Sequence, residues 1–364
     1  MSVRSASVTP RRLLTITQVP GWLLGWWAVG RLVAIATALA LKPTVWTLDR
    51  WDGRWYRMVA RGGYLLVPGR QSDPAFFPLY PILLRGVHAA GVGWGVAGPL
   101  LSNVALLVGL GLFHELTREI FSEQLARRST TYLAVFPLGY VFSMAYPESV
   151  VLVLLTAAPL AALRRRWWLA AICAGAAALT RPEALFLAFP LADIAWRQRR
   201  SLSPARCGAA LAAVLAPVAA IASYSLYLAT VLHDPLAWSQ AERAWGRQFR
   251  LTGLFHAFAH LSAAVGHRPW LVRDVVCFFL YLALLYAARR AGTPPAWLAA
   301  GAAVVILPVF TGACDSIGRF GLLAPPLLWG LAGLTKTERS ERVVRTVLLA
   351  LLVVGTVSLA YVFP

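Results

Sequence analysis

The sequence predicts an all-α polytopic membrane protein, and three properties of the chain support this prediction. Of its 364 residues 59% are hydrophobic, and the mean hydropathy is +0.65. Only 13% are charged, about half the fraction of a typical soluble domain. Apolar stretches of about 20 residues, long enough to cross a bilayer as a helix, recur from residue 21 to the C-terminus. This composition excludes a soluble enzyme, a coiled coil and a disordered chain.

Apolar stretches separated by charged or proline-containing turns predict about 11 transmembrane helices. Two of these stretches, 167–180 and 183–196, are short for a full crossing and are separated by Pro182. We expect them to form a broken or re-entrant pair whose backbone is buried in protein. The expected spans are 21–41, 95–114, 129–146, 148–163, 167–180, 183–196, 207–230, 271–288, 295–312, 318–334 and 345–362.

The basic residues indicate how these helices are oriented. The formal charge is +19, but lysine and arginine lie in turns between apolar stretches, so nucleic acid is not an expected partner. Basic clusters such as Arg164-Arg165-Arg166 occur at every other turn, which places the N-terminus in the cytoplasm. Arginine outnumbers lysine 32 to 2, as is typical of a GC-rich bacterial gene. We therefore expect a multi-pass protein of a bacterial plasma membrane.

The spans form a single predicted domain over 1–364, with no internal repeat and no separate soluble region. Two of the predicted outer loops, 42–94 and 231–270, are long, whereas the inner turns are short. The first loop also carries seven basic residues on the side where few are expected. We therefore expect the functional surface to be extracytoplasmic.

The cysteines and histidines do not predict a metal site. Cys173, Cys207, Cys277 and Cys314 show no CxxC spacing, and three of them fall inside apolar stretches. His256 and His260 are four residues apart, but the acid of an HExxH motif and an obvious third ligand are both missing. We expect no metal and no cofactor.

The first outer loop contains an expected interfacial helix over residues 50–61. At about 100° per residue its four arginines fall on one narrow stripe, which favours contact with water and lipid headgroups. Asp52 lies at the edge of the opposite side, where it is a candidate to enter a cleft or to cap the helix. The stripe consists of Arg50, Arg54, Arg57 and Arg61, and the expected buried side of Trp51, Trp55, Met58 and Val59.

The segment from Asp73 to Pro81 follows this helix and contains three prolines. Proline fixes φ and removes a backbone donor, so no regular helix is expected here. Such a rigid segment next to an acidic helix suits the wall of a cleft, although an ordinary packing loop would have the same composition.

Several short motifs resemble the PIG-V family of mannosyltransferases, which are relatives of GPI mannosyltransferase 2. The resemblance extends over most of the chain, but its specific part is residues 51–81. The motifs there are Trp51-Asp52, Tyr56, Gly63-Tyr64 and Phe76-Phe77-Pro78-Leu79-Tyr80-Pro81, and later ones are Tyr146-Pro147-Glu148, Leu179-Thr180-Arg181 and Arg319-Phe320.

The resemblance implies a GT-C fold and a membrane glycosyltransferase that uses a polyprenyl-phosphate-linked mannose donor. It implies that Asp52 is the catalytic base and that Arg181 and Arg319 bind the donor phosphate. The chain is shorter than eukaryotic members, so a GPI precursor is not the expected acceptor. The acceptor, a glycolipid, a glycan or a protein, is left open.

The chemistry of such a transfer fits these residue types. A carboxylate can take the proton of the acceptor hydroxyl, and arginine can bind the leaving phosphate with two parallel N–H groups. No nucleotide is needed, consistent with the lack of a P-loop. Glu148, Glu183 and Arg319 have plainer interpretations, as first-turn acids and as a helical partner of Asp315. The remaining candidates for the cleft are Trp51, Tyr56, Asp73, Tyr80, Glu148 and Glu183.

Two other classes of protein remain alternatives. A transporter or lipid flippase would place ionisable residues near the bilayer midplane, where the sequence clearly places only Arg31. A structural or assembly protein would not need a cleft that contains Asp52 and arginines. The order of preference is therefore glycosyltransferase, then transport or assembly.

Overall fold

The computed structural model describes residues 20–44, 46–259, 266, 270–312 and 314–358, and these residues contain helices and no strands. The predicted all-α class is confirmed. Within this part of the chain four helices are long and apolar enough to span a bilayer, or five if one bent pair is counted as a span. The four are α1 (Gly21–Leu41), α4 (Trp94–Ile120), α9 (Pro204–Leu232) and α13 (Trp270–Arg290).

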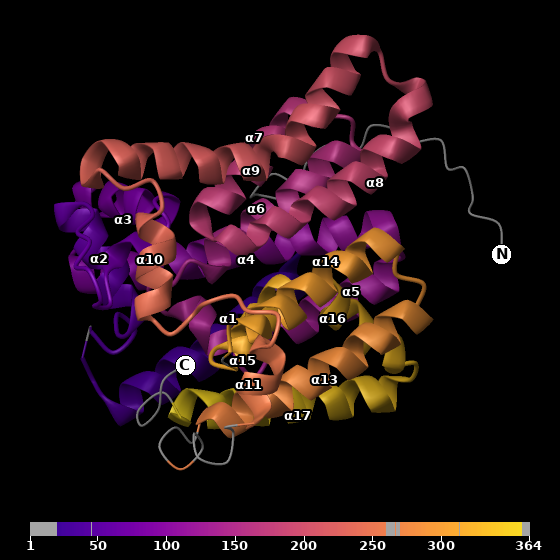
Figure 1. Ribbon diagram of the computed structural model, residues 1–364. Helices are drawn as coiled ribbons and strands as arrows, with labels where there is room; N and C mark the ends of the chain where they lie inside the picture. The colour runs from indigo at the N-terminus through magenta and orange to yellow at the C-terminus, as the bar shows by residue number, and fades with distance from the viewer. Residues whose placement is uncertain (1–19, 45, 260–265, 267–269, 313, 359–364) are drawn as a thin grey trace.

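Shorter helices complete the bundle (Figure 1). α4 packs against α6, α6 against α7, and α7 against α9, while α13 packs against α16 and α1 against α17. The predicted number of about 11 spans is not confirmed, because α6, α7 and α14 have only 16, 14 and 12 residues. The shorter helices are α5 (Glu123–Ala134), α6 (Glu148–Leu163), α7 (Trp167–Thr180), α8 (Ala188–Gln198), α14 (Pro295–Ile306) and α16 (Pro325–Leu334). α17 (Glu338–Ser358) has 21 residues, as many as α1 and α13.

The two long loops also contain helices. α2 (Asp52–Gly62), α3 (Leu79–Ala89) and α10 (Ala237–Ala244) lie together at one end of the bundle, on the left in Figure 1, and α11 (Gly253–Ala259) follows α10. The buried side of α2 is rotated from the expected one: Asp52, Tyr56 and Val59 are buried, whereas Trp51 and Met58 are 38% and 44% exposed. The sequence therefore predicted an amphipathic helix but misplaced its buried side.

The expected span 129–146 is wrong. α5 ends at Ala134, and a 3-10 turn, η3 (Gly139–Ser143), follows Pro137. Irregular backbone inside a membrane protein needs partners for its carbonyl groups. Arg31 supplies such a partner: its guanidinium donates to the Gly139 carbonyl at 2.8 Å and to the Ala134 carbonyl at 3.3 Å. It also donates to the Ser143 hydroxyl at 2.8 Å. The buried arginine of α1 thus allows the chain to leave the helix before α6.

The expected span 318–334 corresponds to a bent pair of helices and not to one continuous helix. α15 (Ile317–Phe320) and η7 (Gly321–Leu323) meet α16 at a bend of 85°. Pro325 and Pro326 begin α16, and a proline pair cannot continue a preceding helix because it lacks backbone donors. The arginine-bearing turn is therefore separate from α16.

Two further expectations about prolines have different outcomes. The break at Pro182 is present, because α7 ends at Thr180 and η4 (Pro182–Leu187) precedes α8. Between Asp73 and Pro81 the expected irregular path holds only as far as Pro78, after a short turn η2 (Asp73–Ala75). α3 then begins at Leu79, because Pro81 lies in the first helical turn, where its missing N–H leaves no bond unmade.

Candidate active site

A polar pocket lies where α2, η4, α15, the end of α10 and the segment after it meet. Its lining combines charged and aromatic side chains from widely separated parts of the sequence. The lining residues are Asp52, Tyr56, Ala75, Phe76, Phe77, Thr180, Arg181, Pro182, Glu183, Glu242, Trp245, Arg247 and Arg319.

Asp52 is the first residue of α2 and is 7% exposed. The residue before it, Trp51, occupies the helix-capping position with φ at 53°, a strained value for a bulky residue that is often found at functional sites. The Asp52 backbone N–H donates to the Tyr146 hydroxyl at 3.3 Å. Gly53 lies so close to the chain before α6 that an added Cβ would be 3.0 Å from that of Ala145. The start of α2 is thus held against the segment that leads to Glu148.

Five charged side chains of alternating sign form what we call the ionic chain: Asp52, Arg319, Glu148, Arg181 and Glu183. An Arg319 nitrogen lies 2.5 Å from the Asp52 carboxylate and 3.8 Å from that of Glu148. Arg181 donates to Glu148 at 2.6 Å and to both oxygens of Glu183 at 2.9 and 3.1 Å. The structure therefore brings the predicted base and both predicted phosphate ligands into one cluster.

Arg319 is held in place by the turn that precedes it. Ser316 has φ at 71°, and the backbone N–H groups of Ser316 and Gly318 donate to the Asp274 carboxylate at 3.1 and 3.0 Å. The Tyr281 hydroxyl donates to the Gly318 carbonyl at 2.6 Å. A side chain at Gly318 would collide with Leu138, 2.6 Å from an added Cβ. Two residues of α13 thus fix the turn that presents Arg319.

The other predicted cleft residues have different positions. Tyr56 and Glu183 line the pocket. Glu148 is fully buried beneath it, and Tyr80, also fully buried, packs on the Tyr56 ring at 5.0 Å. Two more candidates do not line the pocket.

Those two candidates are Trp51 and Asp73. Trp51 is 38% exposed, and the Arg50 guanidinium lies over its ring. Asp73 is buried and accepts from the Leu65 N–H at 2.7 Å, a bond that closes the loop between α2 and η2. Of the predicted arginine stripe, Arg54 and Arg61 are exposed, whereas Arg57 pairs with buried Asp49.

The second long loop contributes three pocket residues, Glu242, Trp245 and Arg247, and none of them is among the site residues predicted from the sequence. Arg247 lies 3.6 Å from Glu242, and Trp245 packs edge-on against Phe76 with ring centroids 5.8 Å apart. A Trp and an Arg in a short outer helix and its C-terminal turn are a weak pattern. Only the tertiary structure, in which Trp245 packs against Trp55 of α2, shows that these residues line the pocket.

Glu242, in the second long loop, lines the pocket beside Arg247. Burial raises the pKa of its carboxyl, and the neighbouring Arg247 guanidinium opposes this effect only in part. Glu183 beside it also raises the pKa. Glu242 therefore keeps its proton to a higher pH than a glutamate in water does.

The described residues contain no group of three or more His, Cys, Asp or Glu side chains placed to hold a metal ion. His256 lies in α11, and His260 is outside the described residues. The four cysteines are free thiols. The expectations of no metal and no cofactor stay predictions.

Solved structures that resemble this one include the oligosaccharyltransferase AglB of Archaeoglobus fulgidus. The complex of AglB with an inhibitory peptide and a dolichol-phosphate aligns with a TM-score of 0.49 at 13% identity over 93% of this chain and 55% of that chain. The form tethered to an acceptor peptide with the NVT sequon has a TM-score of 0.47 at the same identity and coverage, and the apo form has 0.49.

This chain thus spans about half the length of the structures it resembles. No family model matches the chain, and no curated protein matches its sequence at a significant level. The TM-scores of these alignments lie below 0.5.

Proposed function

We propose that the chain is a membrane glycosyltransferase of the GT-C class that transfers mannose from a polyprenyl-phosphate-linked donor to an extracytoplasmic acceptor. The observation that carries the proposal is the contact between Asp52 and Arg319, which are 267 residues apart in sequence and 2.5 Å apart in the pocket. The sequence motifs assign a base to the first position and a phosphate ligand to the second. Their meeting in one cavity supports a transfer reaction there.

Each charged group has a role in this reaction. The acceptor hydroxyl oxygen attacks the anomeric carbon, and Asp52 takes the hydroxyl proton. The bond from that carbon to the phosphate oxygen breaks, and polyprenyl phosphate leaves with the bonding electron pair. Arg181 and Arg319 stabilise the negative charge that develops on the phosphate. Attack opposite the leaving group inverts the configuration of the sugar.

The ionic chain imposes an order on substrate binding. The Asp52 oxygen that accepts a hydrogen bond from Arg319 is occupied, so it cannot at the same time take the proton of the acceptor hydroxyl. The donor phosphate competes with Asp52 for Arg319. Once Arg319 turns to the phosphate, Asp52 is released to accept a proton, so donor binding precedes activation of the acceptor.

The aromatic wall of the pocket suits a sugar ring. Phe76 and Trp245 both line the pocket and pack edge-on against each other, and Tyr56 packs on Phe76 at 5.0 Å. Apolar ring faces are the usual contact for the C–H faces of a sugar, while the charged groups opposite bind its polar substituents. We assign this wall to the transferred mannose or to the acceptor sugar next to it.

The test is release of polyprenyl phosphate from polyprenyl-phosphomannose by the purified full chain in lipid nanodiscs, supplied with a crude acceptor extract. Asp52→Asn should lower the rate by about 10²- to 10⁴-fold, the usual contribution of a general base. Asp193→Asn is the matched control, because Asp193 lies on α8 and pairs with Arg197 outside the pocket.

The assignment of the base fails if Asp52→Asn turns over as fast as the wild type. Solute or lipid transport in proteoliposomes that survives Asp52→Asn, together with no release by the wild type, would favour the transporter alternative.

A further inference from the structure

A basic cavity of about 360 Å³ lies between the N-terminal ends of α7 and α9, two helices that pack side by side (Figure 1). Its size is within the range of small-ligand sites. α7 ends at Thr180, next to Arg181, so this cavity lies at the opposite end of α7 from the active-site pocket. Three arginines, two tryptophans, a leucine and two alanines line the cavity.

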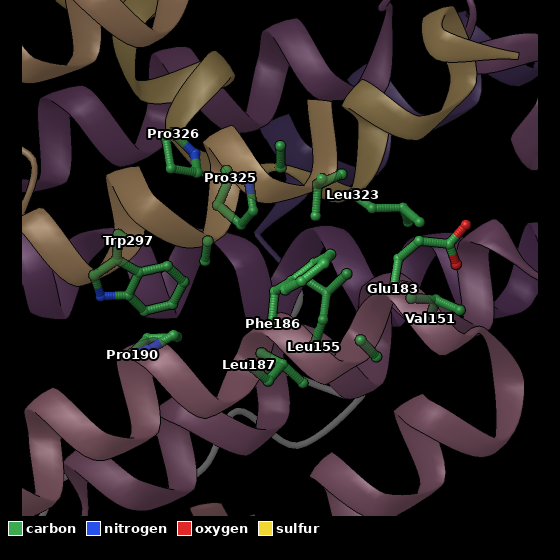
Figure 2. A pocket seen from close by; sticks show the side chains of 15 residues that line it. Val151, Leu155, Glu183, Phe186, Leu187, Pro190, Trp297, Leu323, Pro325 and Pro326 are labelled. Carbon is green, nitrogen blue, oxygen red and sulfur yellow. The ribbon is translucent and has the colours of Figure 1, made fainter. Parts of the chain in front are cut away.

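A cavity between α6, η4, α8, α14 and α16 differs from it in size and in lining (Figure 2). The free volume there is about 40 Å³, room for about three water molecules. Apart from Glu183, every lining residue is Val, Leu, Ala, Gly, Phe, Pro or Trp. That space is a gap in the packing of the bundle, whereas the basic cavity has room for a ligand.

The three arginines give the basic cavity a positive charge that the protein does not compensate. Arg165, Arg166 and Arg206 come from two different turns, and no acidic residue lines the cavity. Their neighbour Arg164 does have a carboxylate partner, Glu115 at 3.0 Å. Within the part of the chain that the structure describes, no carboxylate lies within 4 Å of the three cavity arginines. The cavity therefore favours an anion.

The turn that carries two of these arginines has a fixed backbone. Arg165 has φ at 60°, its N–H donates to the Ala162 carbonyl at 2.9 Å, and the Arg166 N–H donates to the Ala161 carbonyl at 2.8 Å. These bonds are the ones that close a helix on a left-handed residue. The Arg165 guanidinium also donates to the Ser201 carbonyl at 3.5 Å. This contact links the turn after α6 to the turn before α9.

Unpaired N–H donors add to the charge of the arginines. Arg166 and Ser203 precede α7 and α9, and neither caps its helix through its side chain. The N–H groups of a first helical turn have no intrahelical acceptor and carry partial positive charge. The indole N–H of Trp167, a lining residue that is 2% exposed, has no acceptor among the described residues. Guanidinium groups and backbone donors together form the donor set that binds phosphate.

The surface next to the cavity is apolar. Trp168 lines the cavity, and Ile172 lies one turn further along α7; they are 66% and 67% exposed. Tryptophan is enriched where membrane helices meet the head groups of the bilayer. A ligand with its phosphate in the cavity can therefore lay an apolar tail along this face of α7. The exposed face favours a phospholipid over a free phosphate ion.

We propose that the basic cavity binds the head group of an anionic phospholipid, with its phosphate between Arg166 and Arg206 and an acyl chain along Trp168 and Ile172. Basic pockets between membrane helices suit acidic lipid head groups. A choline head group would instead bring a positive charge next to the arginines. The proposal does not depend on the proposed function, because this lipid takes no part in the transfer reaction.

The experiment is photolabelling of the full chain in phosphatidylcholine nanodiscs with a phosphatidylglycerol that carries a diazirine at the start of one acyl chain. We expect labelled peptides that contain residues 165–172. Arg166→Gln/Arg206→Gln should raise the half-saturating mole fraction of the labelled lipid about 30-fold, because each arginine near a head group contributes about fivefold. Arg206→Gln alone should raise it about fivefold, and it serves if the double variant does not fold.

Arg199→Gln/Arg200→Gln is the matched control, because it removes the same charge from exposed residues of the turn before α9 that do not line the cavity. It should label like the wild type. If both double variants weaken labelling equally, a generally basic surface attracts the lipid and the proposal is overturned. Equal labelling of the wild type by phosphatidylcholine with the same diazirine would also overturn it, because the cavity would not select an anionic head group.

A last arm separates the lipid from free phosphate. Unlabelled phosphatidylglycerol should displace the labelled lipid, whereas inorganic phosphate should act no more strongly than chloride of the same ionic strength. If inorganic phosphate displaces the labelled lipid and chloride does not, the cavity is a site for the free ion and the lipid proposal is overturned.

Discussion

The two ends of α6 carry two ionic clusters, and their difference shows what distinguishes a site from a stabilising network. Glu148, at the start of α6, belongs to the ionic chain. Arg164 follows the last residue of α6 and donates to Glu115 and Glu119 at 3.0 and 2.9 Å, and Arg118 donates to Glu115 at 2.7 Å. We call these four residues, Glu115, Arg118, Glu119 and Arg164, the distal cluster.

Both clusters alternate acids and arginines at similar distances, yet their construction differs. The distal cluster joins one helix, α4, to the turn after α6, and its partners are three to 49 residues apart. The ionic chain joins parts of the sequence up to 267 residues apart and borders a pocket. Positive φ does not separate the two clusters, because Arg165, next to Arg164, has φ at 60°. Ion pairing alone therefore does not indicate function. Ion pairing across distant parts of the sequence at the edge of a pocket is what points to function.

The largest expected contrast comes from removing one arginine of each cluster. Arg319→Gln should lower mannose transfer by about 10²- to 10³-fold, because it removes a charge that stabilises the leaving phosphate. Arg118→Gln should leave the rate unchanged. The measurement is kcat/KM for polyprenyl-phosphomannose, with size-exclusion profiles as a check on folding. If kcat/KM fell equally in both variants, the two clusters would differ in their effect on folding and not in a catalytic role.

A smaller effect is expected at Asp274, which touches neither pocket nor substrate. Asp274→Asn keeps the size of the side chain but removes its negative charge. The hydrogen bonds that it accepts from the backbone N–H groups of Ser316 and Gly318 become weaker. We expect kcat to fall about tenfold while KM for the acceptor stays constant, because a misplaced Arg319 loses contacts made in the transition state. A rise in KM with unchanged kcat would contradict a positioning role.

The distal cluster should affect stability alone. Arg164→Gln removes the partner that Glu115 and Glu119 share, and we expect the thermal unfolding temperature to fall by a few degrees. Transfer measured well below that temperature should match the wild type. A loss of transfer at low temperature would mean that the two ends of α6 are coupled.

The smallest expected effect concerns Glu242 and pH. Its pKa is raised in the folded chain by burial, so the unfolded chain loses this proton at lower pH and the folded state loses stability as pH rises through that range. Glu242→Gln removes this dependence. The unfolding temperature of the variant should therefore match that of the wild type near pH 4 and exceed it at pH 7. If the wild type were more stable than the variant at pH 7, the pKa of Glu242 would be lowered and not raised by folding, which would contradict this prediction.

The sequence predicted the class and part of the site for physical reasons that are local. Apolar stretches of membrane length do not depend on tertiary contacts, so the positions of α1, α4, α9 and α13 follow from composition. The prediction of a span over 129–146 was wrong because an apolar stretch can form either a membrane helix or buried irregular backbone. The contacts of the distant Arg31 with Gly139 and Ser143 favour the irregular backbone, and the local sequence does not report them.

The chain by itself therefore determined a helical membrane protein with an acidic motif at Asp52 and candidate phosphate ligands at Arg181 and Arg319. Tertiary structure decided that these three meet, that Glu148 lies between the two arginines, and that Glu242, Trp245 and Arg247 close the pocket. The physical reason is that charge pairing and cavity shape depend on through-space distance. No local pattern reports that distance for residues brought together by the packing of α2, α6, α7 and α15.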